Sequence, residues 1–249
     1  MMLDGKVAIV TGSSRGIGAA TAKLLAAHGA RVAVNYTQNR EQGERVLAEI
    51  AQSGGRAILV QADVTVREQV EAMVRRTEAA IGPVDILVNN ANMRFRVAPF
   101  LEYRWEDFEE KLLNELKASF YCCQAVVAGM VERHSGCIVN VSSGLSRVPG
   151  KGFIAHTSAK SALDAFSKSL ALELGPYGIR VNVVAPGLTL TDATAHQPKE
   201  MHEAAAAHTP LKRLAGPDDI AGAVLFYCVD WSRFVTGTYL PVCGGTQMT

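Results

Sequence analysis

The sequence shows no excess of charge of either sign. Its 249 residues include 25 Lys and Arg and 24 Asp and Glu, which gives a formal net charge of +1 at pH 7. Proteins that bind nucleic acids or anionic membranes usually carry a clustered basic surface. The balanced charge therefore predicts no nucleic-acid partner and no membrane partner.

Paired cysteines and long apolar runs are also missing. The five cysteines are odd in number and stand mostly in apolar segments, without the spacing of a metal site or of a secreted disulfide framework. We therefore expect no metal ion, buried reduced thiols and a cytoplasmic location. The first apolar run, Val7–Val10, is too short for the hydrophobic region of a signal peptide, and no run is long enough to span a membrane.

Hydrophobic residues make up 48% of the chain and fall in short β-type runs that alternate with amphipathic segments. Most of the runs are almost continuously apolar, as parallel strands covered on both faces are. The alternation predicts a single α/β domain over residues 1–249, a doubly wound Rossmann-type fold with a parallel seven-stranded sheet and helices on both faces. The predicted strands are Val7–Val10, Arg31–Asn35, Ala57–Gln61, Ile86–Asn89, Cys137–Val141, Val181–Ala185 and Tyr239–Val242.

The least regular stretch follows the sixth predicted strand. Residues of about 188–213 have an alanine-rich centre and few strand or turn signals. A segment of this length near the edge of a sheet is typical of a lid over a ligand site. An ordinary surface helix explains its composition equally well.

Three glycines follow the first predicted strand and lead directly into a helix. Gly12, Gly16 and Gly18 allow the backbone to turn tightly and to approach a pyrophosphate, whose charge a helix N-terminus stabilises. Such a glycine pattern by itself is weak evidence. Its place between the first strand and the first helix makes a dinucleotide the expected ligand.

With Thr11 before it, this loop resembles that of the short-chain dehydrogenase/reductase family, and the similarity extends along nearly the whole chain. The reductases that act on 3-oxoacyl thioesters of acyl carrier protein resemble it most. Further segments that match the family are Asp63-Val64, Asn89-Asn90-Ala91, Ser143, Pro186-Gly187 with Thr191, Val235-Thr236-Gly237 and Gly244-Gly245.

The resemblance implies a cofactor site along the predicted edge of the sheet. NAD-selective sites place a carboxylate after the second strand, whereas none follows Val34 here. Arg15 lies in the glycine loop, where its guanidinium can face a 2′-phosphate, so NADP(H) is the predicted cofactor, with Arg40 as a second contact. The predicted cofactor-binding residues are Gly12, Ser14, Arg15, Gly16, Ile17, Gly18, Asn35, Tyr36, Thr37, Asp63, Val64, Asn90, Ala91, Lys160, Pro186, Gly187, Thr189 and Thr191.

Four catalytic positions are also implied by the resemblance. Ser143 takes the place of the Ser that hydrogen-bonds the substrate oxygen, and Lys160 that of the Lys that binds the nicotinamide ribose. Asn114 takes the place of the Asn that holds a water chain. The fourth position is His156, where the family has the Tyr that donates a proton to the substrate carbonyl oxygen.

Imidazole at position 156 changes the proton step. It is shorter than phenol, so a bridging water is needed if the substrate keeps its place. A free His titrates near about pH 6.5 and Tyr near about 10, and Lys160 is expected to push His156 further towards its neutral form. Neutral imidazole accepts a proton more readily than it donates one. Alcohol oxidation should therefore suffer less than ketone reduction.

The resemblance thus predicts an NADP(H)-dependent oxidoreductase of a small-molecule carbonyl/alcohol pair. It also implies a homotetramer built through the helices that contain Asn114 and Lys160. Two other functions stay open. One is a non-redox enzyme, for dehydration or cyclisation, that uses His156 as a base. The other is a catalytically impaired nucleotide-binding relative that acts as a partner subunit.

Overall fold

The computed structural model describes residues 1–192, 194–195 and 197–248. In these residues all strands form one parallel sheet in the order β3-β2-β1-β4-β5-β6-β7. The seven predicted strands are confirmed, with ends that differ by at most two residues. Their bounds are β1 Val7–Val10, β2 Arg31–Tyr36, β3 Arg56–Gln61, β4 Ile86–Asn89, β5 Gly136–Val141, β6 Ile179–Pro186 and β7 Tyr239–Val242.

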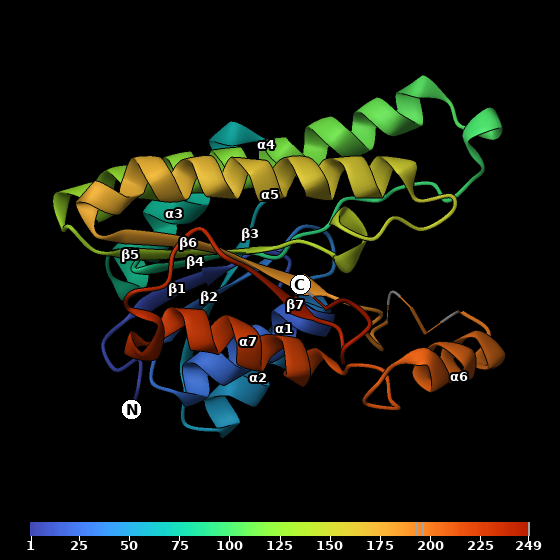
Figure 1. The fold of residues 1–249 in the computed structure, drawn as a ribbon. Coiled ribbons are helices and arrows are strands. Elements are labelled where there is room, and N and C mark those ends of the chain that lie inside the picture. The colour runs from blue at the N-terminus through green and yellow to red at the C-terminus, as the bar shows by residue number, and fades with distance from the viewer. Residues whose placement is uncertain (193, 196, 249) are drawn as a thin grey trace.

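Helices cover both faces of the sheet (Figure 1). One face carries α1 (Gly16–Ala27), α2 (Arg40–Gln52) and α7 (Pro217–Cys228). The other face carries α3 (Arg67–Ile81) and the two long helices α4 and α5. The bounds of these two are α4 Trp105–Glu132 and α5 Ile154–Leu174.

Each face of the sheet has its own hydrophobic core. In β1, Val10 packs into the core beneath α1, α2 and α7, and its neighbour Ile9 packs into the core beneath α3, α4 and α5. Successive side chains of a strand point to opposite faces. Because both faces are covered, every position of the strand is apolar, which explains the continuous apolar runs of the sequence.

The strand order changes direction around β1, which pairs with β2 on one side and with β4 on the other. In doubly wound sheets, ligands bind outside the carboxyl ends of the strands at such a point. The segments that follow β1, β4 and β5 therefore converge on one edge of the sheet. This edge contains most of the predicted site residues.

The segment predicted as a lid, about 188–213, contains the helix α6 (Lys199–His208). No residue of α6 is buried, and the helix extends beyond the carboxyl edge of the sheet (Figure 1). The surface-helix interpretation is confirmed for this part, and the lid stays a prediction. Residues 193 and 196 of the segment lie outside the described residues.

Among the described residues, no helix combines the length and the apolar character that crossing a bilayer requires. All five cysteines are free and buried, as the sequence predicted.

Candidate active site

The glycine loop between β1 and α1 forms one end of the site. Gly12 and Gly16 adopt φ angles of 59° and 55°, in the left-handed region that glycine enters most easily. A Cβ on Gly18 would lie 2.5 Å from Asn90 Nδ2, so no larger residue fits there. Among the described residues, the N-cap residue Arg15 forms no capping hydrogen bond through its side chain, and the first turn of α1 contains no acidic residue. The loop and the uncapped helix therefore fit the pyrophosphate of a dinucleotide.

Buried amide side chains hold this loop in place. The Gly12 N–H donates to Asn35 Oδ1 at 3.0 Å, and Asn35 Nδ2 donates to Ala62 O at 3.1 Å. Asn90 Nδ2 donates to Thr11 O at 2.9 Å. Asn35 was predicted as a cofactor contact, but its side chain lies beneath the loop and is occupied by these bonds. We therefore assign it a supporting position rather than a ligand-facing one.

The next part of the edge lies where β2 and β3 end. Thr37 follows β2 and donates from Oγ1 to Ala62 O at 3.3 Å, while Asp63 accepts hydrogen bonds from the N–H and the hydroxyl of Thr65. Arg15 is exposed at the N-cap of α1. Arg40, the second predicted cation, forms an ion pair of 2.7 Å with Glu44. Among the remaining predicted contacts here, Tyr36 and Val64 are buried and Ser14 and Ile17 are half-buried.

The segment after β6, where the predicted lid begins, lies at another side of the site. Gly187 follows Pro186 and donates its N–H to Val242 O at 3.0 Å. A Cβ on Gly16 would lie 3.6 Å from the Thr191 side chain, so Thr191 is close to the glycine loop. Thr189 forms a bridge to Ala215. A cavity of about 550 Å³ lies between α1 and this segment, and both Gly16 and Thr191 line it.

Ala91 links the glycine loop to the strand end of β4. A Cβ on Gly12 would lie 3.0 Å from Ala91 Cα, which shows how closely the two segments approach. The Ala91 N–H donates to Thr11 Oγ1 at 3.0 Å. The predicted contacts after β1 and β4 are therefore brought together.

The catalytic candidates come from the end of β5 and from α5. Ser143 follows β5, and its Oγ accepts a hydrogen bond from the Leu145 N–H at 3.2 Å. His156 and Lys160 are both buried and lie one helical turn apart on α5. Lys160 Nζ donates to Val141 O at 2.7 Å, which anchors α5 to the strand that leads into Ser143. His156 therefore lies one helical turn from Lys160, which contacts the strand end that leads into Ser143.

The residue of α4 that reaches Lys160 is Glu115, not Asn114. Glu115 Oε1 lies 2.5 Å from Lys160 Nζ, and both side chains are almost completely buried. Asn114 is half-buried and points about 100° away around the helix. The contact with Lys160 therefore belongs to Glu115, and the water-chain role of Asn114 stays a prediction. Two polar residues stand next to each other in the sequence, and only the packing of α4 on α5 decides which one faces the site.

Lys111 lies one turn before Glu115 on α4 and was not predicted as a site residue. Its Nζ is 2.5 Å from Glu115 Oε2 and donates to Asn92 Oδ1 at 2.8 Å and to Met93 O at 2.9 Å. Burial lowers the pKa of Lys111 to about 8, although the Glu115 carboxylate acts to raise it. The only signal in the sequence was the spacing of four residues between Lys111 and Glu115, which is typical of helical ion pairs.

The Glu115 carboxylate remains charged in these surroundings. Burial acts to raise its pKa, but the charges of Lys160 and Lys111 outweigh burial and lower the pKa to about 2. One buried carboxylate is therefore shared by two buried lysine side chains.

His156 is covered by an aromatic ring. The ring of Phe95, in the loop after β4, stacks on the imidazole with centroids 4.4 Å apart and an angle of 23° between the planes. Burial, assisted by the charges of Lys160 and Lys111, lowers the pKa of His156 to about 3. Within the described part of the chain, His156 Nδ1 is buried without a hydrogen-bond partner. His156 is therefore neutral near pH 7.

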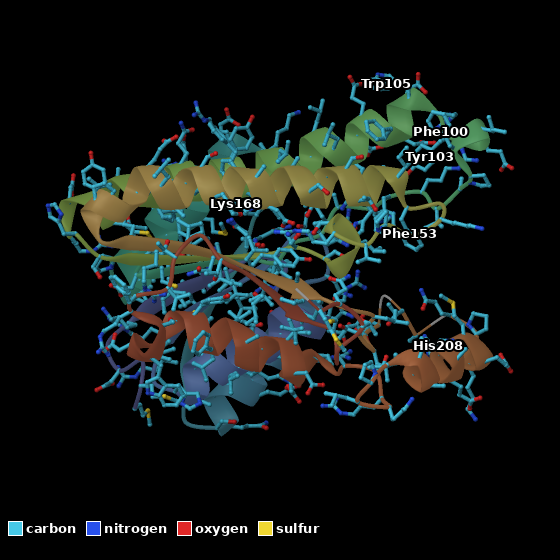
Figure 2. The ribbon with its side chains drawn as sticks, viewed as in Figure 1. Phe100, Tyr103, Trp105, Phe153, Lys168 and His208 are labelled. Atoms are coloured by element: carbon cyan, nitrogen blue, oxygen red, sulfur yellow. The ribbon has the colours of Figure 1, made fainter. Side chains whose placement is uncertain are left out.

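The rim of the site is aromatic on the side of α4. Figure 2 shows Phe100, Tyr103 and Trp105 grouped around the start of α4, with His208 at the end of α6 on the opposite side of this edge. Phe153 lies just before α5, and its ring centroid is 6.0 Å from that of Phe95.

Comparisons with known proteins cover almost the whole chain. Residues 12–247 match the family model described as Enoyl-(Acyl carrier protein) reductase. A 3-oxoacyl-[acyl-carrier-protein] reductase of Synechocystis is 37% identical over 99% of this chain and 98% of its own. A (2S)-[(R)-hydroxy(phenyl)methyl]succinyl-CoA dehydrogenase subunit of Thauera aromatica is 38% identical over 100% of this chain and 99% of its own.

The fold is shared with a solved structure as well. The crystal structure of a dehydrogenase/reductase from Sinorhizobium meliloti matches with a TM-score of 0.91 and 39% identity, over 99% of this chain and 96% of that chain. The comparisons of sequence and of fold therefore agree. This chain belongs to the short-chain dehydrogenase/reductase family of oxidoreductases.

Proposed function

We propose that this protein is an NADP(H)-dependent oxidoreductase that interconverts a carbonyl compound and an alcohol. The observation that carries this proposal is the convergence of the glycine loop with Ser143, His156 and Lys160 at one edge of the sheet. The reductases among its relatives act on 3-oxoacyl groups by their names. A 3-oxoacyl thioester or a related ketone is therefore the proposed substrate class.

The residues at the edge fit the proposed cofactor. The glycine loop and the N-terminus of α1 would hold the pyrophosphate, Arg15 the 2′-phosphate, and Lys160 the nicotinamide ribose. When bound, the nicotinamide supplies or accepts the hydride. The chain itself has to orient the substrate and stabilise the charge on its oxygen.

His156 stabilises the charge on the substrate oxygen in its neutral form. With a pKa of about 3, the imidazolium is a minor species near neutral pH. A neutral imidazole N–H can still donate a hydrogen bond to a carbonyl oxygen and stabilise the negative charge that develops there. Ser143 Oγ offers a second donor. The weak proton supply predicts a slow enzyme, because positioned acid–base catalysis is worth roughly 10²–10⁴-fold in rate.

Two further proposals concern the oligomeric state of the protein and its cellular location. The exposed side chains of Phe120 on α4 and Leu172 on α5 support a homotetramer that uses these helices. Burial of all five free cysteines suits a reducing compartment such as the cytoplasm.

The function can be tested with purified protein, NADPH and a panel of 3-oxoacyl thioesters and simple ketones. We expect slow, substrate-dependent loss of the NADPH absorbance, and a further loss of rate of roughly 10²-fold in Ser143→Ala. His156→Tyr should raise the rate of ketone reduction by about 10²-fold, because phenol can donate the proton that neutral imidazole holds. A matched comparison of both variants with the double variant shows whether the two residues act on the same step.

One outcome favours a second candidate function. If NADPH binds but neither the native protein nor His156→Tyr turns over any substrate, the oxidoreductase proposal fails. A nucleotide-binding partner subunit then becomes the better explanation.

A further inference from the structure

A cluster of three buried charged side chains lies between α4 and α5 and includes the catalytic candidate Lys160. It consists of Lys111 and Glu115 on α4 and Lys160 on α5, and we call it the Lys–Glu–Lys cluster. The three side chains are between 0% and 3% exposed. Buried charges are costly unless each is paired and hydrogen-bonded. The pairing within the cluster therefore decides whether Lys160 can stay charged in this place.

Glu115 divides its two oxygens between the two lysines. Oε1 is 2.5 Å from Lys160 Nζ, whereas Oε2 is 2.5 Å from Lys111 Nζ and accepts the Met93 N–H at 3.2 Å. Lys160 Nζ makes one further bond, to Val141 O at 2.7 Å. An ammonium has three donors, so this arrangement leaves one hydrogen of Lys160 to a ligand.

Lys111 uses its donors differently. Its Nζ contacts Asn92 Oδ1, Met93 O and Glu115 Oε2, so all three hydrogens bind groups of the protein. These bonds tie α4 to the loop that carries Phe95 over His156, and Lys111 Nζ lies 5.2 Å from the centre of the Phe95 ring. Lys111 therefore connects Glu115 to the cover of the catalytic His.

Few other charged groups face the cluster. From α5 it is faced by His156, which is neutral, and one turn beyond Lys160 by Asp164, which lies beside Ser142 and Ser146 and whose pKa burial raises. The loop after β4 contributes the uncharged side chains of Asn92, Met93 and Phe95. Glu115 is therefore the carboxylate on which the charge balance of the two lysines depends.

We propose that Glu115 is a positioning residue of the reaction. Its Oε1 holds the Lys160 ammonium in position for the cofactor, and its Oε2 is paired with the Lys111 ammonium. This inference rests on the proposed function, because it takes Lys160 as the residue that binds the nicotinamide ribose. It assigns Lys111 a role that neither the motifs of the sequence nor the position of Ser143, His156 and Lys160 required. Loss of Glu115 leaves two buried ammonium groups without their shared partner.

A double-mutant cycle tests the proposal. NADPH dissociation constants are measured by nucleotide fluorescence for the native protein, Glu115→Gln, Lys111→Met and the double variant, with the exposed Glu110→Gln on the same helix as a control. Glu115→Gln should weaken NADPH binding on the order of a hundredfold, and Lys111→Met only about threefold. The double variant should bind better than Glu115→Gln alone, because the second ammonium is gone. Additive losses, or unchanged binding in Glu115→Gln, would overturn the proposal.

A second measurement separates positioning from damage to the fold. The KM for the ketone at saturating NADPH should stay within about twofold in Glu115→Gln, since Glu115 acts on the cofactor through Lys160. In a variant that is merely misfolded, the KM for the ketone and the dissociation constant for NADPH should both rise. If Glu115→Gln fails to fold, the double variant is compared with Lys111→Met, and about tenfold weaker NADPH binding is expected in the double variant. Equal binding of these two variants would contradict the role of Glu115.

Failure of the broader proposal looks different. If the native protein does not bind NADPH at all, the proposed function and this inference fall together. If the native protein binds NADPH but the cycle is additive, only the inference falls.

Discussion

His156 and Glu115 lie beside the same lysines, yet one is uncharged and the other charged near neutral pH. Burial, assisted by the charges of Lys160 and Lys111, lowers the pKa of the imidazole to about 3. Burial acts to raise the pKa of the carboxylate, but the same two charges outweigh it and lower this pKa to about 2. Loss of a proton makes the imidazole neutral and the carboxylate negative. A buried site with two ammonium groups therefore selects a hydrogen-bonding His and an ion-pairing Glu.

The pKa of His156 predicts a loss of stability in acid. An unfolded His binds a proton near about pH 6.5, whereas His156 in the folded protein does so near about 3, so the unfolded chain binds more protons between these values and stability falls as pH falls. Between about pH 6.5 and 4.5, the free energy of unfolding of His156→Tyr should fall by about 2–3 kcal/mol less than that of the native protein. Urea denaturation of both proteins at the two pH values measures this difference.

Below about pH 4.5 the Glu115 carboxylate adds to the loss in the same direction, since its pKa is also lowered by folding. The exposed His208→Gln on α6 is the control and should leave the acid slope unchanged. Equal slopes in the native protein and in His156→Tyr would show that His156 is not the group responsible.

Arg15 carries the expected selectivity for NADP(H). Its exposed guanidinium at the start of α1 can pair with a 2′-phosphate, and such a charged contact is worth roughly tenfold in affinity. Arg15→Ala should therefore weaken NADPH binding about tenfold and leave NADH binding unchanged. Arg40→Ala, which removes a residue already paired with Glu44, should change NADPH binding less. Equal loss for both nucleotides in Arg15→Ala would speak against a 2′-phosphate contact.

At the scale of helices and strands, the sequence predicted best what depends on local pattern. Each strand is a run of apolar residues because helices cover both its faces, and each predicted strand was found within two residues. The direction in which each side chain points around a helix was harder to predict. One residue of difference turns a side chain by about 100°, which exchanged Glu115 for Asn114 in the predicted site.

A pair of helical glycines offers a test at this scale. Gly18 in α1 has no room for a Cβ, which would lie 2.5 Å from Asn90 Nδ2 and from Gly12 O. Gly18→Ala should therefore destabilise the protein by about 1–3 kcal/mol and weaken NADPH binding more than about tenfold. Gly222 in α7 has nothing within 4 Å of a Cβ, so Gly222→Ala should stabilise by up to about 1 kcal/mol. Thermal unfolding and nucleotide titration distinguish the two, and similar behaviour of both variants would contradict the close approach at Gly18.

At the scale of the whole molecule, α4 and α5 cover one face of the sheet and still expose apolar side chains. Leu172 is 81% exposed and Phe120 is 46% exposed. Both helices also carry the Lys–Glu–Lys cluster on their buried sides. An assembly through these helices would therefore stiffen the elements that hold Glu115 and Lys160.

Light scattering after gel filtration tests the proposed homotetramer. Leu172→Glu should break the assembly into smaller species, because a carboxylate in an apolar interface loses its hydration without gaining a partner. Met201→Glu, on the exposed α6, is the matched control and should leave the mass unchanged. A monomeric native protein, or an unchanged mass of Leu172→Glu, would exclude an interface at this position.

The sequence by itself determined the fold class and the position of the glycine loop. These depend on local patterns, namely apolar runs and glycines between a strand and a helix. Ser143, His156 and Lys160 were named as catalytic candidates through the resemblance to the family. Only the tertiary structure decided that Glu115 rather than Asn114 meets Lys160, that Lys111 joins them, and that Phe95 covers a neutral His156. These contacts join segments far apart in the chain, and the charge of each group follows from burial and neighbours that local sequence does not contain.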